Sequence, residues 1–162
     1  MPTKPTAKKA CFVVAPIGEE GSDVRKRSDK VFEILKRALA FGYKPIRSDQ
    51  IAEPGMISHR MIQLLVEAPL VIADLTGANP NVYYELAIRH AAGKPVIQLI
   101  AKGEKIPFDI ADMRTIVIDV AEQFAAEERI KASAKEIDKP GYRVTTPISM
   151  ALNQAAILQA GS

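Results

Sequence analysis

The sequence predicts an α/β protein with a flavodoxin-like fold, a three-layer sandwich built on a five-stranded parallel sheet. Apolar runs of strand length alternate along the chain with longer segments whose apolar residues recur at helical spacing. The first run, ACFVVAPI, is apolar on both faces, which is typical of a strand buried inside a parallel sheet. Strands that alternate with helices in this way form such a sheet through right-handed crossovers.

Length and composition indicate one globular domain. At 162 residues the chain is long enough for one domain with a full core and too short for two comfortable ones. Hydrophobic residues make up 48% of it and charged residues 25%, which is the composition of a globular rather than a disordered protein. We expect residues 1–9 to form a flexible tail and residues 10–160 to form the domain.

Charge and hydropathy argue against two classes of partner. The formal charge of +3, from 22 basic and 19 acidic residues, is modest, so nucleic-acid binding has little support. No stretch approaches the ~20 uninterrupted apolar residues that a membrane span needs. The short apolar run after the first lysines has no signal cleavage site. We therefore expect a cytoplasmic protein that binds neither nucleic acid nor membranes.

The first half of the chain predicts two strands and two helices. Residues 10–17 form the first strand and residues 18–27 a polar loop. Ser28 is a suitable N-cap for the helix that follows. Residues 43–47 form the second strand. The second helix ends near Glu67 and is predicted by four apolar residues at helical spacing, Ile57, Met61, Leu64 and Leu65.

The second half predicts three more strands and three helices. Residues 69–73 form the third strand, which Asp74 ends. Asn79 and Pro80 are typical of an N-cap and first helical position, and Gly93 is typical of a helix stop. The remaining elements are strands at residues 96–100 and 115–120 and helices at residues 121–137 and 149–159.

Polar side chains gather where the predicted strands end. In an open parallel sheet, ligands bind outside the carboxyl ends of the strands, where loops and helix N-termini converge. Asp74 lies at such an end, and Asn81 and Glu85 share one face of the following helix because they are four residues apart. The polar residues that we expect to contact substrate at this rim are Asp49, Asp74, Asn79, Asn81 and Glu85.

Carboxylates and amides without metal-ligand spacing suit chemistry at a sugar anomeric carbon. The oxocarbenium-like centre of such a reaction needs negative charge or a carboxylate nucleophile. The same residues also have structural explanations. Asp74 and Asn79 can cap a turn or a helix, and Glu85 can pair with Arg89 on a solvated helix face. Spacing alone does not decide between these explanations.

Other kinds of site have weak support in the sequence. Receiver domains hold Mg²⁺ with an acidic pair after the first strand, where this chain has Ala15 and Pro16. The phosphate-binding, dinucleotide-binding and serine-nucleophile motifs do not occur. His59 and His90 are far apart and lack further ligands, and Cys11 lies in an apolar run. We expect no metal and no cofactor.

One long segment resembles two related families. LVIADLTGANPNVYYELAIRHAAGKPVIQLI, with CFVVAPIG before it, is similar to the core of the nucleoside 2-deoxyribosyltransferase-like proteins and of TIR-type domains. The similarity covers roughly residues 11–119 and is sharpest in D-L-T-G, N-P-N, E-L and G-K-P. Both families have a flavodoxin-like sheet and a glutamate on the helix that follows a hydrophobic strand and a polar turn.

The resemblance implies a role for each residue near that helix. The matching glutamate forms a covalent sugar intermediate in the transferases and promotes cleavage of the nicotinamide–ribose bond of NAD in enzymatic TIR domains. Glu85 is the residue that matches it in both. Asp74 would orient the sugar or the base, and Asn81 would bond a ribose hydroxyl. Backbone groups of Ile17 and Gly18 would line the pocket.

The chain departs from both families close to this glutamate. Val82, Tyr83 and Tyr84 stand where TIR domains commonly have a tryptophan–cysteine pair, and Ala87 stands where the transferases usually have a glycine. Either Tyr83 or Tyr84 stacks on a base, or the ring packs against the sheet. The resemblance therefore specifies the bond type better than the substrate.

These observations give three expectations for function. The first is cleavage of an N-glycosidic bond in a nucleotide, specifically NAD hydrolysis with nicotinamide release, so that NAD is a substrate and not a cofactor. The second is a nucleoside 2-deoxyribosyltransferase or nucleoside hydrolase, and the third is a non-catalytic module that binds a nucleotide or a partner. The TIR resemblance further implies a role in bacterial antiphage defence and activation by assembly, hence a homo-oligomer.

Overall fold

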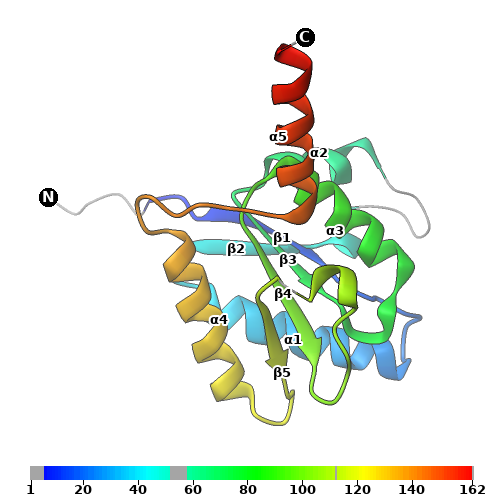
Figure 1. The fold of residues 1–162 in the computed structure, drawn as a ribbon. Coiled ribbons are helices and arrows are strands. Elements are labelled where there is room, and N and C mark those ends of the chain that lie inside the picture. The colour runs from blue at the N-terminus through cyan, green and yellow to red at the C-terminus, as the bar shows by residue number, and fades with distance from the viewer. Residues whose placement is uncertain (1–5, 52–57, 112, 162) are drawn as a thin grey trace, which may run out of the picture.

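The computed structural model describes residues 6–51, 58–111 and 113–161. Its centre is a parallel sheet of five strands in the order β2-β1-β3-β4-β5 (Figure 1). This is the flavodoxin winding, so the predicted fold class is confirmed. The strands are β1 (Lys9–Val14), β2 (Tyr43–Arg47), β3 (Leu70–Asp74), β4 (Val96–Ala101) and β5 (Thr115–Ile118).

Helices cover both faces of the sheet and bury a separate apolar cluster on each (Figure 1). One cluster joins the sheet to α1 and α4, and the other joins it to α2 and α3. The central strand β3 is buried over its whole length, as an interior strand of a parallel sheet must be. The helices are α1 (Asp23–Ala38), α2 (His59–Glu67), α3 (Pro80–Ala92), α4 (Gln123–Ile137) and α5 (Pro147–Ala160).

Element boundaries differ from the prediction most at the first helix. α1 begins at Asp23, and its N-cap is Ser22, whose hydroxyl accepts a hydrogen bond from the Arg25 backbone N–H. Ser28, the predicted N-cap, is buried inside the helix and accepts a hydrogen bond from Arg47. The prediction was wrong because the first turns of α1 are charged and largely exposed, so they carry no apolar periodicity.

The other boundaries differ by a few residues. β1 ends at Val14 rather than at residue 17, and β5 ends at Ile118. α4 begins at Gln123, two residues later than predicted, and α5 begins at Pro147, two residues earlier. Ile57, the first apolar residue predicted for the second helix, lies outside the described residues.

The outer edge of β2 offers no free backbone donor. The Lys9 N–H of β1 donates to the Gly42 carbonyl, so the backbone at Gly42 faces β1. Since backbone groups alternate along a strand, the N–H of Tyr43 points away from the sheet, where it donates to the Leu39 carbonyl. The next outward position is Pro45, which has no N–H. The third is the N–H of Arg47, which donates to the Gln50 side chain. All three outward positions are therefore closed, as is typical of a protected edge strand.

α5 is attached to the domain only through its first turn. Its N-cap, Thr146, is fully buried and donates from its hydroxyl to the His90 carbonyl at the end of α3, at 2.7 Å. Beyond that turn the helix extends away from the body of the domain (Figure 1). Among the described residues, no helix has the length and apolarity needed to cross a membrane.

Candidate functional site

The helix α3 sets the position of Glu85. Asn79 caps this helix, because its side-chain oxygen accepts hydrogen bonds from the backbone N–H groups of Asn81 and Val82 at 2.9 and 3.4 Å. Gly93 ends it in the left-handed conformation, with φ of 64°. Both predicted helix signals are confirmed, and they place Glu85 in the second turn, on the side that packs toward β1 and β3.

Glu85 is a buried carboxyl group with an unused oxygen. The residue is 6% exposed, and its Oε2 atom has no hydrogen-bond partner among the described residues. Burial raises the pKa of this carboxyl from 4.5 to about 7. A buried polar atom without a partner is costly, and perturbed carboxyl groups of this kind cluster at functional sites.

Glu85 and Arg89 do not form the ion pair that their spacing allows. The Arg89 guanidinium is fully buried and donates to three backbone carbonyls, those of Leu65, Ala68 and Pro95. No carboxylate in the described part of the chain pairs with it. The explanation of Glu85 as half of a solvated surface pair is therefore excluded.

Asp74 lies at the carboxyl end of β3 and is held by both of its oxygens. Oδ2 accepts from Arg27 of α1 at 2.7 Å, and Oδ1 accepts from the backbone N–H and the hydroxyl of Thr76 at 3.1 and 2.6 Å. The Asp74 side chain is 1% exposed. The second terminal nitrogen of Arg27, Nη2, is buried and has no partner among the described residues. The strand end thus carries a neutralised carboxylate beside an unused cationic donor.

The remaining predicted residues occupy varied environments. Asn81 is exposed in the first turn of α3, and Tyr84 is 58% exposed. Tyr83 is half-buried against the cluster under α2 and α3, which matches the packing explanation rather than base stacking for this ring. Asp49 binds the Arg47 guanidinium through both oxygens, at 2.7 and 3.0 Å. The loop after β2 is therefore fixed by an ion pair.

The loop after β1 is shaped by an arginine. Arg25 donates to the carbonyl of Ile17 at 3.1 Å and to that of Gly18 at 3.4 Å. Gly18 has φ of +66°, and a Cβ there would lie 2.8 Å from the Ser22 hydroxyl, so only glycine fits. The Arg25 guanidinium therefore holds this loop through both carbonyls.

Sequence analysis missed the arginines of this loop. Arg25 and Arg27 belong to the run RKR, which reads as a solvated surface cluster when its helix is not recognised. The signal that would have found them is Ser22 followed by Asp23, an N-cap and an acidic first-turn residue, because a helix that begins there carries Arg27 toward the end of β3. Among the described residues, no group of three or more histidine, cysteine, aspartate or glutamate side chains could hold a metal ion.

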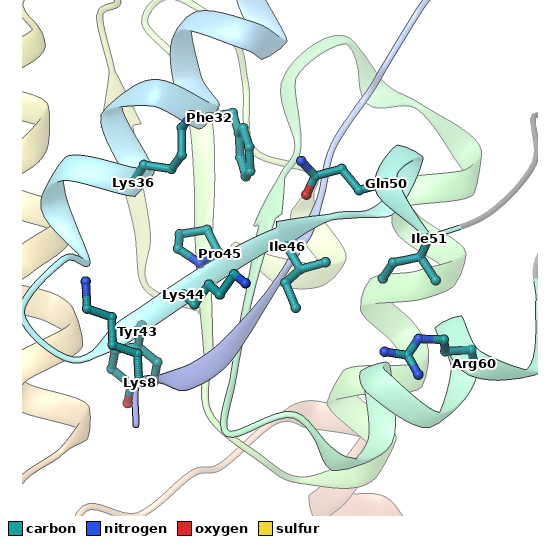
Figure 2. Close-up of a pocket in the computed structure, with 10 residues that line it drawn as sticks. All are labelled: Lys8, Phe32, Lys36, Tyr43, Lys44, Pro45, Ile46, Gln50, Ile51 and Arg60. Carbon is teal, nitrogen blue, oxygen red and sulfur yellow. The ribbon is translucent and has the colours of Figure 1, made fainter. Parts of the chain in front are cut away.

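One sizeable hollow of the described structure lies elsewhere. It has a volume of about 850 Å³ and follows the outer edge of β2, between α1 and the start of α2 (Figure 2). None of the predicted site residues lines it. Four basic side chains do, namely Lys8, Lys36, Lys44 and Arg60. The hollow is thus separate from Asp74 and Glu85.

Comparisons with known proteins give structural neighbours only. Neither a family model nor a curated protein sequence matches the chain. A CMP N-glycosidase from Clostridium botulinum superposes with a TM-score of 0.56 at 15% identity, over 76% of this chain and 98% of that one. A 2-deoxyribosyltransferase from Bacillus psychrosaccharolyticus gives a TM-score of 0.54 at 17% identity, over 73% and 90%.

A third neighbour extends the same group. The 2-deoxyribosyltransferase of Leishmania mexicana gives a TM-score of 0.51 at 16% identity, over 73% of this chain and 95% of that one. Identities this low show a shared fold. Taken with the strand order and the helix layers, they indicate that this chain has the nucleoside deoxyribosyltransferase-like fold.

Proposed function

We propose that this protein cleaves the N-glycosidic bond of a nucleotide, with Glu85 as the nucleophile. The observation that carries this proposal is the buried, unpartnered oxygen of Glu85 on the helix that follows the central strand. A carboxylate in that place is suited to a carbohydrate centre, because it can form a covalent glycosyl ester. The solved neighbours, a CMP N-glycosidase and two deoxyribosyltransferases, support the same bond type.

The proposed reaction has two steps. The Glu85 carboxylate attacks C1′ of the sugar, a C1′–O bond forms, and the electrons of the C1′–N bond leave with the base. Water then attacks C1′ and the C1′–O bond to Glu85 breaks. The proton lost by the water goes to solvent for a substrate such as NAD, whose base leaves neutral, and replaces the proton taken up by the departing base for a substrate such as CMP. With a pKa of about 7, Glu85 is ionised in roughly half of the molecules at neutral pH, as the first step requires.

Arg27 and Asp74, at the carboxyl end of β3, would bind the substrate on which Glu85 acts. The unused Nη2 donor of Arg27 favours a substrate with an anionic or oxygen-rich group, which supports a nucleotide over a nucleoside. Asp74, fixed by Arg27 and Thr76, would orient the sugar or base without competing for C1′. Asn81, Asn79, Tyr84, Asp49 and the backbone of Ile17 and Gly18 remain proposed substrate contacts.

Two nucleotides are the first candidates. NAD follows from the TIR-type resemblance of the segment around Glu85, and it would release nicotinamide as a neutral molecule. CMP is supported by the N-glycosidase with the same fold. Base exchange between deoxynucleosides is the second candidate function, supported by the deoxyribosyltransferases with this fold. Antiphage defence, activation by assembly and a cytoplasmic location remain proposals from the same resemblance and from composition.

Product analysis tests the proposal directly. The purified protein is incubated separately with NAD, with CMP, and with a deoxynucleoside plus a free base, and the released or exchanged bases are separated by chromatography. We expect Glu85→Gln to lower turnover at least about a thousandfold, because removal of a nucleophile costs that much or more. Glu128→Gln, at an exposed site on α4, is the matched control and should keep full activity.

The pH profile and a covalent trap complete the test. A nucleophile must be ionised, so kcat/KM should rise with pH through about 7. Mass spectrometry of the quenched enzyme should find a sugar on Glu85 in the wild type and not in Glu85→Gln. Full turnover in Glu85→Gln would remove Glu85 from its role, and no turnover of any of these substrates would refute the proposed function and leave a binding module.

A further inference from the structure

The C-terminal helix α5 exposes an uncharged, apolar surface. None of its 14 residues is charged, in a chain in which a quarter of the residues are. Four large apolar side chains on it are mostly exposed: Met150 at 60%, Leu152 at 53%, Ile157 at 72% and Leu158 at 71%. In Figure 1 the helix stands away from the rest of the domain.

The attachment of α5 is well defined. The hydroxyl of Thr146 accepts from the Ser149 backbone N–H, and the Thr146 N–H donates to the Ser149 hydroxyl, each at 3.0 Å. Thr146 also donates to the His90 carbonyl, so this capping box is fastened to α3. The helix is therefore a built and oriented element, and its exposed apolar surface is presented in a fixed direction.

The apolar residues of α5 occupy more than one face. Met150 and Ile157 are seven residues apart and share one face, whereas Leu152 lies on the opposite side of the helix at 100° per residue. Uncharged polar side chains lie between them, but large apolar side chains that face water on several sides of a helix are unfavourable. Within the described part of the chain, only the first turn of α5 is covered, which leaves the large apolar side chains beyond it in contact with water.

We propose that α5 is a self-association surface, on which the α5 helix of a second copy of this chain packs. The charge pattern selects this occupant: an uncharged surface requires an uncharged counterpart, and the same helix in a second copy is one. A two-fold axis would then bring each apolar stripe against itself. A membrane surface is a poorer match, because helices that lie on membranes carry lysine and arginine on their polar face and α5 has neither.

The size of the surface sets the strength of the association. Stable interfaces use about 20–30 residues from each partner. α5 supplies 14, and its first turn is already used by α3. We therefore propose a reversible, concentration-dependent association rather than a permanent oligomer. This inference does not rest on the proposed glycosidase activity.

Sedimentation of the 162-residue chain tests the proposal. Between about 5 and about 500 μM, the wild type should shift from monomer toward dimer or a higher even state, as expected for a small apolar interface. Ile157→Lys should raise the dissociation constant at least about tenfold, because it places a charge on the apolar surface that the second copy would cover. Phe124→Lys is the matched control, since Phe124 is 76% exposed on α4, and it should behave as wild type.

A distance measurement identifies the element involved. Cys11 is fully buried, so a cysteine introduced by Gln154→Cys is the accessible thiol and can carry a spin label. Helices that pack on each other lie 8–10 Å apart, so labels on two paired copies of α5 should be within roughly 30 Å. A label at Phe124→Cys should not give this short distance.

Three results would overturn the proposal. They are a wild type that stays monomeric over the whole concentration range, an association that Ile157→Lys leaves unchanged, and the absence of a short distance between α5 labels. Ile157→Lys is at an exposed position, so an unchanged thermal unfolding curve would show that a loss of association is not a loss of folding.

Discussion

Two buried charged residues on α3 have opposite surroundings. Glu85 and Arg89 are one turn apart, and the exposed fractions are 6% and 0%. Arg89 donates four hydrogen bonds, which reach the end of α2 and the start of β4. Glu85 has an oxygen with no partner among the described residues. The same helix therefore holds one charge that is fully used by the fold and one that is not.

The pKa directions follow from this difference. Burial lowers the pKa of Arg89 to about 10, so the guanidinium keeps its charge at neutral pH and its donors stay in place. Burial raises the pKa of Glu85 to about 7, so this carboxyl can gain or lose a proton near neutral pH. A charge with partners stabilises the fold, and a charge without partners is available for chemistry at some cost in stability.

The largest effect is expected from replacing Arg89, the residue whose hydrogen bonds the fold uses. Arg89→Met keeps much of the side-chain volume but removes the donor to the Leu65, Ala68 and Pro95 carbonyls, of which, among the described residues, Pro95 alone keeps another donor, the Val71 N–H. We expect the free energy of unfolding to fall by about 4 kcal/mol, since each lost partner costs about 1–3 kcal/mol and the effects overlap. Urea denaturation of Arg89→Met and the wild type measures this change in the free energy of unfolding.

The control for Arg89 is an exposed arginine with a similar bond. Arg129 of α4 donates to the Val117 carbonyl at 2.8 Å in an exposed setting. Arg129→Met should change the free energy of unfolding by no more than about 0.5 kcal/mol. If both variants lost the same free energy of unfolding, burial would not be the reason that the Arg89 hydrogen bonds stabilise the fold.

A smaller effect of opposite sign is expected at Glu85. The unfolded carboxyl ionises near its ordinary pKa of 4.5, whereas the folded one keeps its proton up to about 7. The unfolded state therefore releases protons first, and the stability of the wild type falls as pH rises from about 4.5 to 7. Glu85→Gln removes this penalty, so it should match the wild type at pH 4 and be more stable by up to about 3 kcal/mol at pH 8.

Stability curves at several pH values test this expectation. Glu128→Gln, on the exposed face of α4, should follow the wild type at every pH. A stability difference at Glu85 that does not change between pH 4 and pH 8 would contradict a buried, titrating carboxyl. The measurement is independent of substrate, so it sharpens the comparison with Arg89 even before an activity is found.

The smallest effect is expected at the cap that positions Glu85. Asn79→Ala removes the oxygen that accepts from two N–H groups of the first turn, and should cost about 1 kcal/mol of unfolding free energy. Asn81→Ala, in the same turn but exposed, should cost no more than about 0.5 kcal/mol. Thermal unfolding of the two variants, measured side by side, tests this expectation. If Asn79 were not the cap, Asn79→Ala would lose no more stability than Asn81→Ala.

The sequence predicted the fold well because the fold depends on local patterns. Apolar runs and helix punctuation defined all five strands and most helix ends, including the Asn79 and Gly93 caps of α3. The start of α1 was missed because its first turns face water, and a solvated helix has no apolar period to read. The winding followed from the handedness of parallel crossovers rather than from any single residue.

The site was harder to predict because burial and pairing are not local. Spacing allowed Glu85 to pair with Arg89, and only the packing of α3 shows that Arg89 is committed to carbonyls of two other segments. The Arg27–Asp74 bond joins residues 47 positions apart, which no periodicity reveals. Glu85 was predicted as a site residue from its spacing on the helix after the third strand, whereas its catalytic role came from the resemblance to known families and stays a prediction.

The closed edge of β2 bears on how concentrated solutions of this protein behave. Fibres built by strand addition need an accepting edge on both sides of every molecule. With Tyr43, Pro45 and Arg47 offering no free backbone donor, a strand from a neighbour cannot form a full ladder of hydrogen bonds beside β2, which leaves the edge at β5. Two molecules joined there would present only closed edges outward. Strand-by-strand growth would therefore stop at a pair.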